Sequence, residues 1–123
     1  MKLVLSTLPK TWLFDLDGLL VAHNGHLREG DRLLPGVQEF WQQLGQKDRI
    51  VLLTARTAAE AAAARDFLVR AGLRVDQILA DCPLGERILL NDAKPSGLCT
   101  AHAVCLPRDA GLAGLSVKLD PEL

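Results

Sequence analysis

Residues 12–18, with the sequence WLFDLDG, decide the fold expected for this chain of 123 residues. The first three residues are apolar, as in a buried strand, and two carboxylates then follow at alternate positions before a glycine that lets the chain turn. Because side chains alternate along an extended strand, Asp15 and Asp17 are expected on one face. The stretch therefore predicts a strand that ends at a polar site.

Further apolar runs alternate with helix-like stretches, which is the pattern of a parallel α/β sheet. Residues 50–53 and 88–90 are the clearest additional strands, and Gln77–Leu79 and residues 103–106 are weaker ones. We therefore predict an α/β fold, specifically a three-layer α/β/α Rossmann-like domain with a mainly parallel sheet of about five strands.

Two helices are expected between these strands. Residues 36–45 carry apolar side chains at helical spacing and end in glycine. A second helix is bounded by Thr57 and Glu60, which have capping-box spacing, and by Gly72 beyond its last turn. No repeat or linker divides the chain, so residues 1–123 are predicted to form one domain, with residues 20–34 as a minimal cap insertion.

Composition excludes several classes of function. The chain is 49 % hydrophobic and 24 % charged with a net charge of −1, so it is globular and carries no basic surface for nucleic acid. No apolar run could span a bilayer or act as a signal peptide, so we expect a cytoplasmic protein without a membrane partner. The cysteines lack metal or redox spacing and are expected to be reduced, mostly buried thiols: Cys82, Cys99 and Cys105.

Histidines give no metal signal, because none of them has a carboxylate at zinc-ligand spacing. His23 and His26 are expected in surface loops, where they could contact a substrate.

The two acids Asp15 and Asp17 carry a stronger indication of function. Phosphoryl transfer through an aspartyl-phosphate needs one carboxylate as nucleophile and another group to protonate the leaving alkoxide, and Asp15 and Asp17 suit that division of roles. The alternative is a solvated loop with two turn-favouring acids.

These residues resemble the haloacid dehalogenase superfamily, whose first motif is an apolar strand followed by Asp-x-Asp-Gly. The resemblance implies that Asp15 attacks phosphorus and binds Mg²⁺, and that Asp17 is the general acid and base and offers its carbonyl to the metal. The second motif, a strand ending in Thr or Ser, matches at Thr54, whose hydroxyl would donate to the phosphoryl group. Ala55 and Arg56 would be substrate contacts beside it, although an arginine at the start of a helix is also typical of a solvent-facing side chain.

The fourth motif of the superfamily is an apolar strand ending in acids, and residues 88–92 match it with Asp92 as the remaining metal ligand. The match departs from the family pattern, because Asn91 or Ser96 stands where a second acid is usual. Together with Asp15 and Asp17, Asp92 would complete an oxygen-ligand site suited to Mg²⁺.

The third motif is a Lys or Arg that holds the nucleophile and the phosphate. Lys94 is the preferred match, because it lies just past the strand that would end at Asp92. Arg87 is the other candidate, but it precedes that strand and is expected at the opposite end of it. After this motif, residues 97–101 resemble the helix before the last strand of small members.

The resemblance implies a magnesium-dependent phosphoric monoester hydrolase acting on a small phosphorylated metabolite such as a sugar phosphate. One alternative is a phosphate-binding or regulatory relative with little or no turnover. A phosphoaccepting receiver domain is a further alternative. It is disfavoured because Leu16 separates the two acids and because the strand before Thr54 ends without an aspartate.

Apolar residues outside the expected core predict a homo-oligomer, because contiguous exposed apolar patches mark interfaces. The alternative is that these residues pack on the protein's own core. They lie in the insertion and near the C-terminus: Leu20, Val21, Leu27, Leu33, Leu34, Leu112, Leu115 and Val117.

Overall fold

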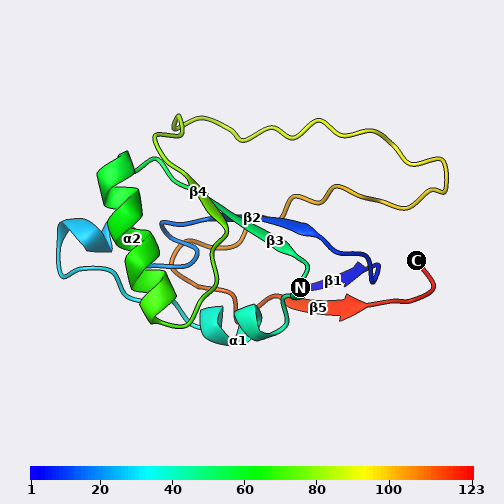
Figure 1. Ribbon diagram of the computed structural model, residues 1–123, viewed down its shortest axis with the longest axis horizontal. Coiled ribbons are helices and arrows are strands. Elements are labelled where there is room, and N and C mark those ends of the chain that lie inside the picture. Colours follow the sequence, from blue (N-terminus) through cyan, green and yellow to red (C-terminus); the bar gives the residue numbers. More distant parts are fainter.

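The computed structural model describes all residues from 1 to 123 and has an α/β fold (Figure 1). None of its helices combines the length and the apolar character needed to cross a bilayer. Along the chain, the elements are β1 (Lys2–Leu5), β2 (Thr11–Asp15), the 3-10 helix η1 (Gly25–Leu27), α1 (Val37–Gln42), β3 (Arg49–Leu53), α2 (Ala58–Arg70), β4 (Gln77–Leu79) and β5 (Ser116–Leu119).

The strands form two small sheets, in both of which the pairing is parallel. One sheet has the order β2-β3-β4, and the other pairs β1 with β5. The strands predicted at residues 12–14, 50–53 and 77–79 are confirmed. The single sheet of about five strands is not found, because β1 and β5 come from the two ends of the chain and pair with each other instead.

Both predicted helices form. Thr57 caps α2 by accepting from the backbone N–H of Glu60, and the Glu60 side chain accepts from the Thr57 backbone N–H, so the capping box is confirmed. α1 begins after Gly36, whose φ of 79° is left-handed. A Cβ at Gly36 would collide with the backbone of Ala113, so only glycine lets the returning C-terminal segment approach the start of this helix.

The core lies on one face of the β2-β3-β4 sheet. Phe14, Ile50 and Leu52 point toward this face and share one buried cluster with residues of both α1 and α2, including Phe40 and Leu68. On the opposite face, Leu13 of β2 is 51 % exposed and Leu79 of β4 is 42 % exposed. The helices therefore cover one face of this sheet, which gives two layers where the sequence predicted three.

A long arm, defined here as residues 83–105, leaves the body of the protein and returns without forming a helix or strand (Figure 1). The strands predicted at residues 88–90 and 103–106 and the helix expected at residues 97–101 are therefore wrong. The arm makes one backbone–backbone hydrogen bond, from Gly97 N–H to the Lys94 carbonyl. A short apolar run favours a strand only where a neighbouring strand can pair with it, and the arm has no such neighbour.

The insertion at residues 20–34 folds onto the body. Asn24 has a left-handed φ of 55° and precedes η1, while Val21 forms β-bridges with Asp17 and Leu33. Most of the apolar residues that predicted an interface belong to the protein's own core: Leu20, Val21, Leu34 and Leu112 are buried, Leu33, Leu115 and Val117 pack against them, and only Leu27 is exposed. The proposed interface patch is therefore absent, because the insertion and the C-terminal segment close over the sheet.

All three cysteines are free, as expected. The prediction that they are mostly buried is wrong, because Cys99 and Cys105 lie exposed on the arm and Cys82, just before it, is half-buried. Burial of these thiols depended on the strand and helix that do not form there.

Candidate functional site

The polar residues predicted to carry chemistry meet where β2 and β3 end. Asp15 is the last residue of β2, Asp17 lies two residues beyond it, and Thr54 follows β3 directly. Because Asp15 pairs with Leu53 in the parallel register, the two strand ends are level. Gly18 has a φ of 84° and allows the turn after Asp17, in agreement with the sequence.

Asp15 is the accessible carboxylate of the site, with a side chain that is 44 % exposed. Its Oδ1 accepts from the Leu16 backbone N–H at 3.0 Å and from Arg87 Nη1 at 2.9 Å. No protein group donates to its Oδ2. The carboxylate is thus held through one oxygen and open at the other, which is the arrangement that a nucleophile needs.

Thr54 is buried, with an exposed fraction of 1 %, and its hydroxyl is used inside the protein. It donates to Asp17 Oδ2 at 3.2 Å and accepts from the Arg56 backbone N–H at 3.1 Å. A hydroxyl has one proton to donate. The structure therefore brings Thr54 to the site but directs its hydroxyl to Asp17, away from solvent where a phosphoryl group would lie. Its neighbour Ala55 is exposed in the turn before α2.

Arg56 is the most heavily bonded side chain of the site. Its Nε and Nη2 donate to Asp17 Oδ1 at 3.1 and 2.7 Å, and its Nη1 and Nη2 donate to the two oxygens of Asp31 at 2.9 and 2.7 Å. Burial by itself lowers the pKa of Arg56, but the hydrogen bonds and charges of Asp31 and Asp17 outweigh it and raise that pKa above its ordinary value. The alternative account, a solvent-facing arginine, is wrong, because two carboxylates stabilise the charge inside the fold.

His26 of η1 also lies at the site, with only 17 % of its side chain exposed. Its Nε2 is 3.1 Å from Glu60 Oε2, and its Nδ1 is 3.9 Å from Asp17 Oδ1. The Nδ1 atom is buried and has no hydrogen-bond partner. Hydrogen bonds from the backbone and hydroxyl of Thr57 lower the pKa of Glu60, so this neighbour is a carboxylate. The expectation of a surface histidine is wrong, because the insertion folds η1 against the start of α2.

Of the two third-motif candidates, Arg87 lies at the site and Lys94 does not, which is the reverse of the sequence-based expectation. Arg87, predicted at the far end of a strand, reaches Asp15, whereas Lys94 pairs with Asp92 at 2.7 Å on the arm. The Asp92 side chain is 69 % exposed. Without the strand at residues 88–90, nothing carries Asp92 and Lys94 to the end of the sheet.

The residues at this site do not fit the magnesium ion that the resemblance implies. No three acids or histidines of the chain are grouped so that they could hold a metal. Of the ligands that the resemblance implies, Asp92 lies on the arm, and the guanidinium of Arg87 lies against Asp15. Mg²⁺ is usually held by one or two carboxylates together with waters and substrate phosphate, and here the one implied carboxylate at the strand ends already pairs with a guanidinium.

Sequence patterns missed two members of the site. Asp31 is one of several charged residues in the insertion, and no spacing distinguishes it from its neighbours Glu29 and Arg32. Glu60 was recognised only as a helix cap, which it also is. Each joins the site through the fold of the insertion, so no local signal could have identified it.

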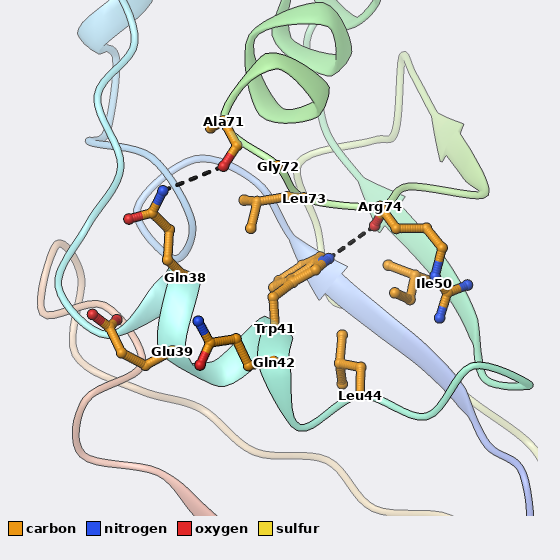
Figure 2. Close-up of a pocket in the computed structure, with 10 residues that line it drawn as sticks. All are labelled: Gln38, Glu39, Trp41, Gln42, Leu44, Ile50, Ala71, Gly72, Leu73 and Arg74. Atoms are coloured by element: carbon orange, nitrogen blue, oxygen red, sulfur yellow. Dashed lines mark hydrogen bonds between the residues drawn. The ribbon is translucent and has the colours of Figure 1, made fainter.

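Two hollows lie at the other end of the sheet, where the strands begin. Figure 2 shows the first, a cavity of about 430 Å³ between α1 and the segment joining α2 to β4. Its polar groups are mostly satisfied: Trp41 Nε1 donates to the Arg74 carbonyl at 2.8 Å, and Gln38 donates to the Ala71 carbonyl at 3.3 Å (Figure 2). The second, of about 490 Å³, is lined by residues that include Lys10 and Trp12. Neither hollow is lined by Asp15 or Asp17.

Chemically, the site offers an open carboxylate with an adjacent guanidinium, and a second carboxylate held in a fixed orientation within the fold. An attacking oxygen and a cation beside it suit transfer of an anionic group such as phosphoryl. Comparisons of the chain with protein-family models, with curated proteins and with solved structures gave no match.

Proposed function

We propose that the protein is a phosphoric monoester hydrolase that forms an aspartyl-phosphate on Asp15. The observation that carries this proposal is the state of the Asp15 carboxylate at the end of β2. One of its oxygens is held by Leu16 and Arg87, while the other is free and accessible. Ligands of open α/β sheets bind beyond the carboxyl ends of parallel strands, which is where this oxygen lies.

In the proposed reaction, Asp15 Oδ2 attacks the phosphorus atom, and the bond from phosphorus to the leaving oxygen breaks. The leaving alkoxide takes a proton from Asp17, the second acid of the same turn, which acts here in its protonated form. Water then attacks the acyl phosphate and gives a proton back to Asp17, which releases inorganic phosphate and regenerates both the Asp15 carboxylate and the acid form of Asp17. Arg87 provides positive charge next to the phosphoryl oxygens.

The proposal includes no step through a metal, because the donor set at the site does not fit Mg²⁺. The substrate class proposed is a small phosphorylated metabolite such as a sugar phosphate, which an open site without a large cap could admit. The exposure of the Asp15 side chain, 44 %, supports a substrate recognised mainly through its phosphate group.

The test is hydrolysis of an aryl phosphate by the wild type, with Mg²⁺ and with EDTA, beside two variants. We expect Asp15→Asn to lose nearly all turnover, since an amide oxygen is a poor nucleophile. Asp66→Asn is the matched control, because Asp66 is an exposed aspartate of α2 that makes no hydrogen bond, and it should turn over like the wild type. Retention of turnover by Asp15→Asn would contradict the assignment.

A second candidate function is phosphate binding without turnover. It is favoured by the internal use of the Thr54 hydroxyl and by the position of Asp92 and Lys94 on the arm. Under this alternative the folded wild type would hydrolyse nothing, yet inorganic phosphate would bind, as measured by calorimetry. Replacement of Arg87 by Ala would then weaken the binding, because the guanidinium is the cation next to Asp15.

A further inference from the structure

A chain of three charged side chains links the insertion to the candidate acid of the reaction. Asp31 lies in the insertion, Arg56 lies between β3 and α2, and Asp17 lies after β2. We propose that Asp31, acting through Arg56, is a positioning residue that fixes the orientation of Asp17. This inference rests on the proposed hydrolysis, in which Asp17 transfers the proton.

The geometry of the guanidinium carries the argument. The Nη1 and Nη2 atoms of Arg56 donate to the two oxygens of Asp31. Its Nε and Nη2 atoms donate to Asp17 at 3.1 and 2.7 Å. Because a guanidinium is planar and rigid, a carboxylate that holds one edge also fixes the direction of the donors on the other edge. Asp31 therefore determines where Arg56 directs the hydrogen bonds that Asp17 receives.

Burial makes this coupling strong. The Arg56 side chain is 3 % exposed, Asp31 is 11 % exposed and Asp17 is 20 % exposed. Water can therefore not replace a lost partner of Arg56, and a buried charge left partly unpaired reorganises its surroundings. If Asp31 is neutralised, Asp17 becomes the only anion paired with Arg56, and the direction of the guanidinium is no longer fixed from its far side.

The Thr54 hydroxyl completes the support of Asp17. It donates to Oδ2, while Arg56 donates mainly to Oδ1, so both oxygens are held. Proton transfer to a leaving oxygen depends on the position of the acid within a fraction of an ångström. Loss of Asp31 should therefore affect the proton-transfer step more than substrate binding or attack by Asp15.

The experiment compares Asp31→Asn with the wild type on an aryl phosphate, whose leaving group needs no proton, and on an alkyl phosphate, whose leaving group does. We expect kcat for the alkyl phosphate to fall about tenfold and kcat for the aryl phosphate to stay within about twofold, with KM changed little for either. Asp31→Glu keeps the carboxylate and should recover part of the alkyl rate. Arg56→Lys keeps the charge but loses the fork, and should show the same selective loss as Asp31→Asn.

The matched control is Glu29→Gln, which removes the same charge from an exposed position of the same insertion and should leave both rates unchanged. Equal losses for the two substrates, or no recovery in Asp31→Glu, would overturn the role of Asp31 while leaving the proposed hydrolysis intact. A wild type without turnover would overturn the proposed hydrolysis and this role together. If Asp31→Asn does not fold, as judged by thermal melting, the selectivity of Asp31→Glu and Arg56→Lys decides the question.

Discussion

Two apolar stretches, one directly after β2 and one in the arm, differ in burial. After β2, Leu16, Leu20 and Val21 are completely buried. In the arm, Ile88 and Leu90 are 79 % and 89 % exposed. The first stretch continues a strand whose neighbour is in place, and its amides find carbonyl partners, as when Leu16 N–H donates to the Leu53 carbonyl. The second has no partner, which shows that apolar character alone does not make a strand.

Acidic side chains of the body and of the arm also differ in the number of hydrogen bonds that they accept. Asp48, just before β3, accepts hydrogen bonds from the backbone N–H groups of Lys10 and Gly45 and from Trp12 Nε1. Asp92, on the arm, accepts only from the exposed Lys94 side chain. An acid embedded in three donors contributes to the fold, whereas an exposed ion pair contributes little.

Backbone amide exchange gives the largest expected difference between the two regions. Strand β3 lies between β2 and β4 and pairs with both. In contrast, residues 83–96 donate no backbone hydrogen bond to another backbone group. We expect β3 amides to exchange at least about ten-thousandfold more slowly than those of residues 88–90. Hydrogen–deuterium exchange read by mass spectrometry measures this, and protection of residues 88–90 in the monomer would break the comparison.

Catalysis gives the next largest effect. Under the proposed function, Asp15→Asn should lower kcat by about a thousandfold or more, because the nucleophile is removed. Asp92→Asn, the same change on the arm, should leave kcat within about twofold, because Asp92 is not at the site. Steady-state hydrolysis of an aryl phosphate measures both. A large loss in Asp92→Asn would show that the arm contributes to the reaction.

Stability should respond unequally to the same truncation in the two regions. Leu52→Ala removes a completely buried side chain of β3 and should lower the free energy of unfolding by about 2–5 kcal/mol. Leu90→Ala removes a side chain that is 89 % exposed and should change it by no more than about 0.5 kcal/mol. Urea denaturation compares the two variants, and similar losses would indicate that the arm packs on something in solution.

The smallest effect concerns Asp48 and pH. Burial raises the pKa of Asp48, but the hydrogen bonds from Trp12, Lys10 and Gly45 outweigh it, so the pKa lies below the ordinary value of 3.8. A lowered pKa stabilises the fold above the pKa of the unfolded chain, and this stabilisation is lost as the pH falls through the folded value. Asp48→Asn should therefore cost about 1–3 kcal/mol at neutral pH.

The cost of Asp48→Asn should shrink as the pH falls below 3.8, since the wild type then loses the same interaction. Denaturation at several pH values measures the difference between the two proteins. A difference that does not change with pH would contradict the role given to the ionised carboxylate.

The sequence by itself determined the local elements of this protein. Strand β2 with the acid at its end, the strand before Thr54 and the capping box of α2 all follow from alternation, periodicity and side-chain hydrogen bonds within a few residues. These signals are local, so they survive whatever the rest of the chain does.

Only the tertiary structure decided the pairing of β1 with β5, the exposure of the arm and the composition of the site. Strand pairing between the two ends of the chain depends on contacts that no local pattern records. The burial of Arg56 between Asp17 and Asp31 likewise depends on the insertion folding over the end of β3. An ion pair forms from residues that the fold brings together, and the charge of Arg56 is stable inside the protein only because both carboxylates arrive with it.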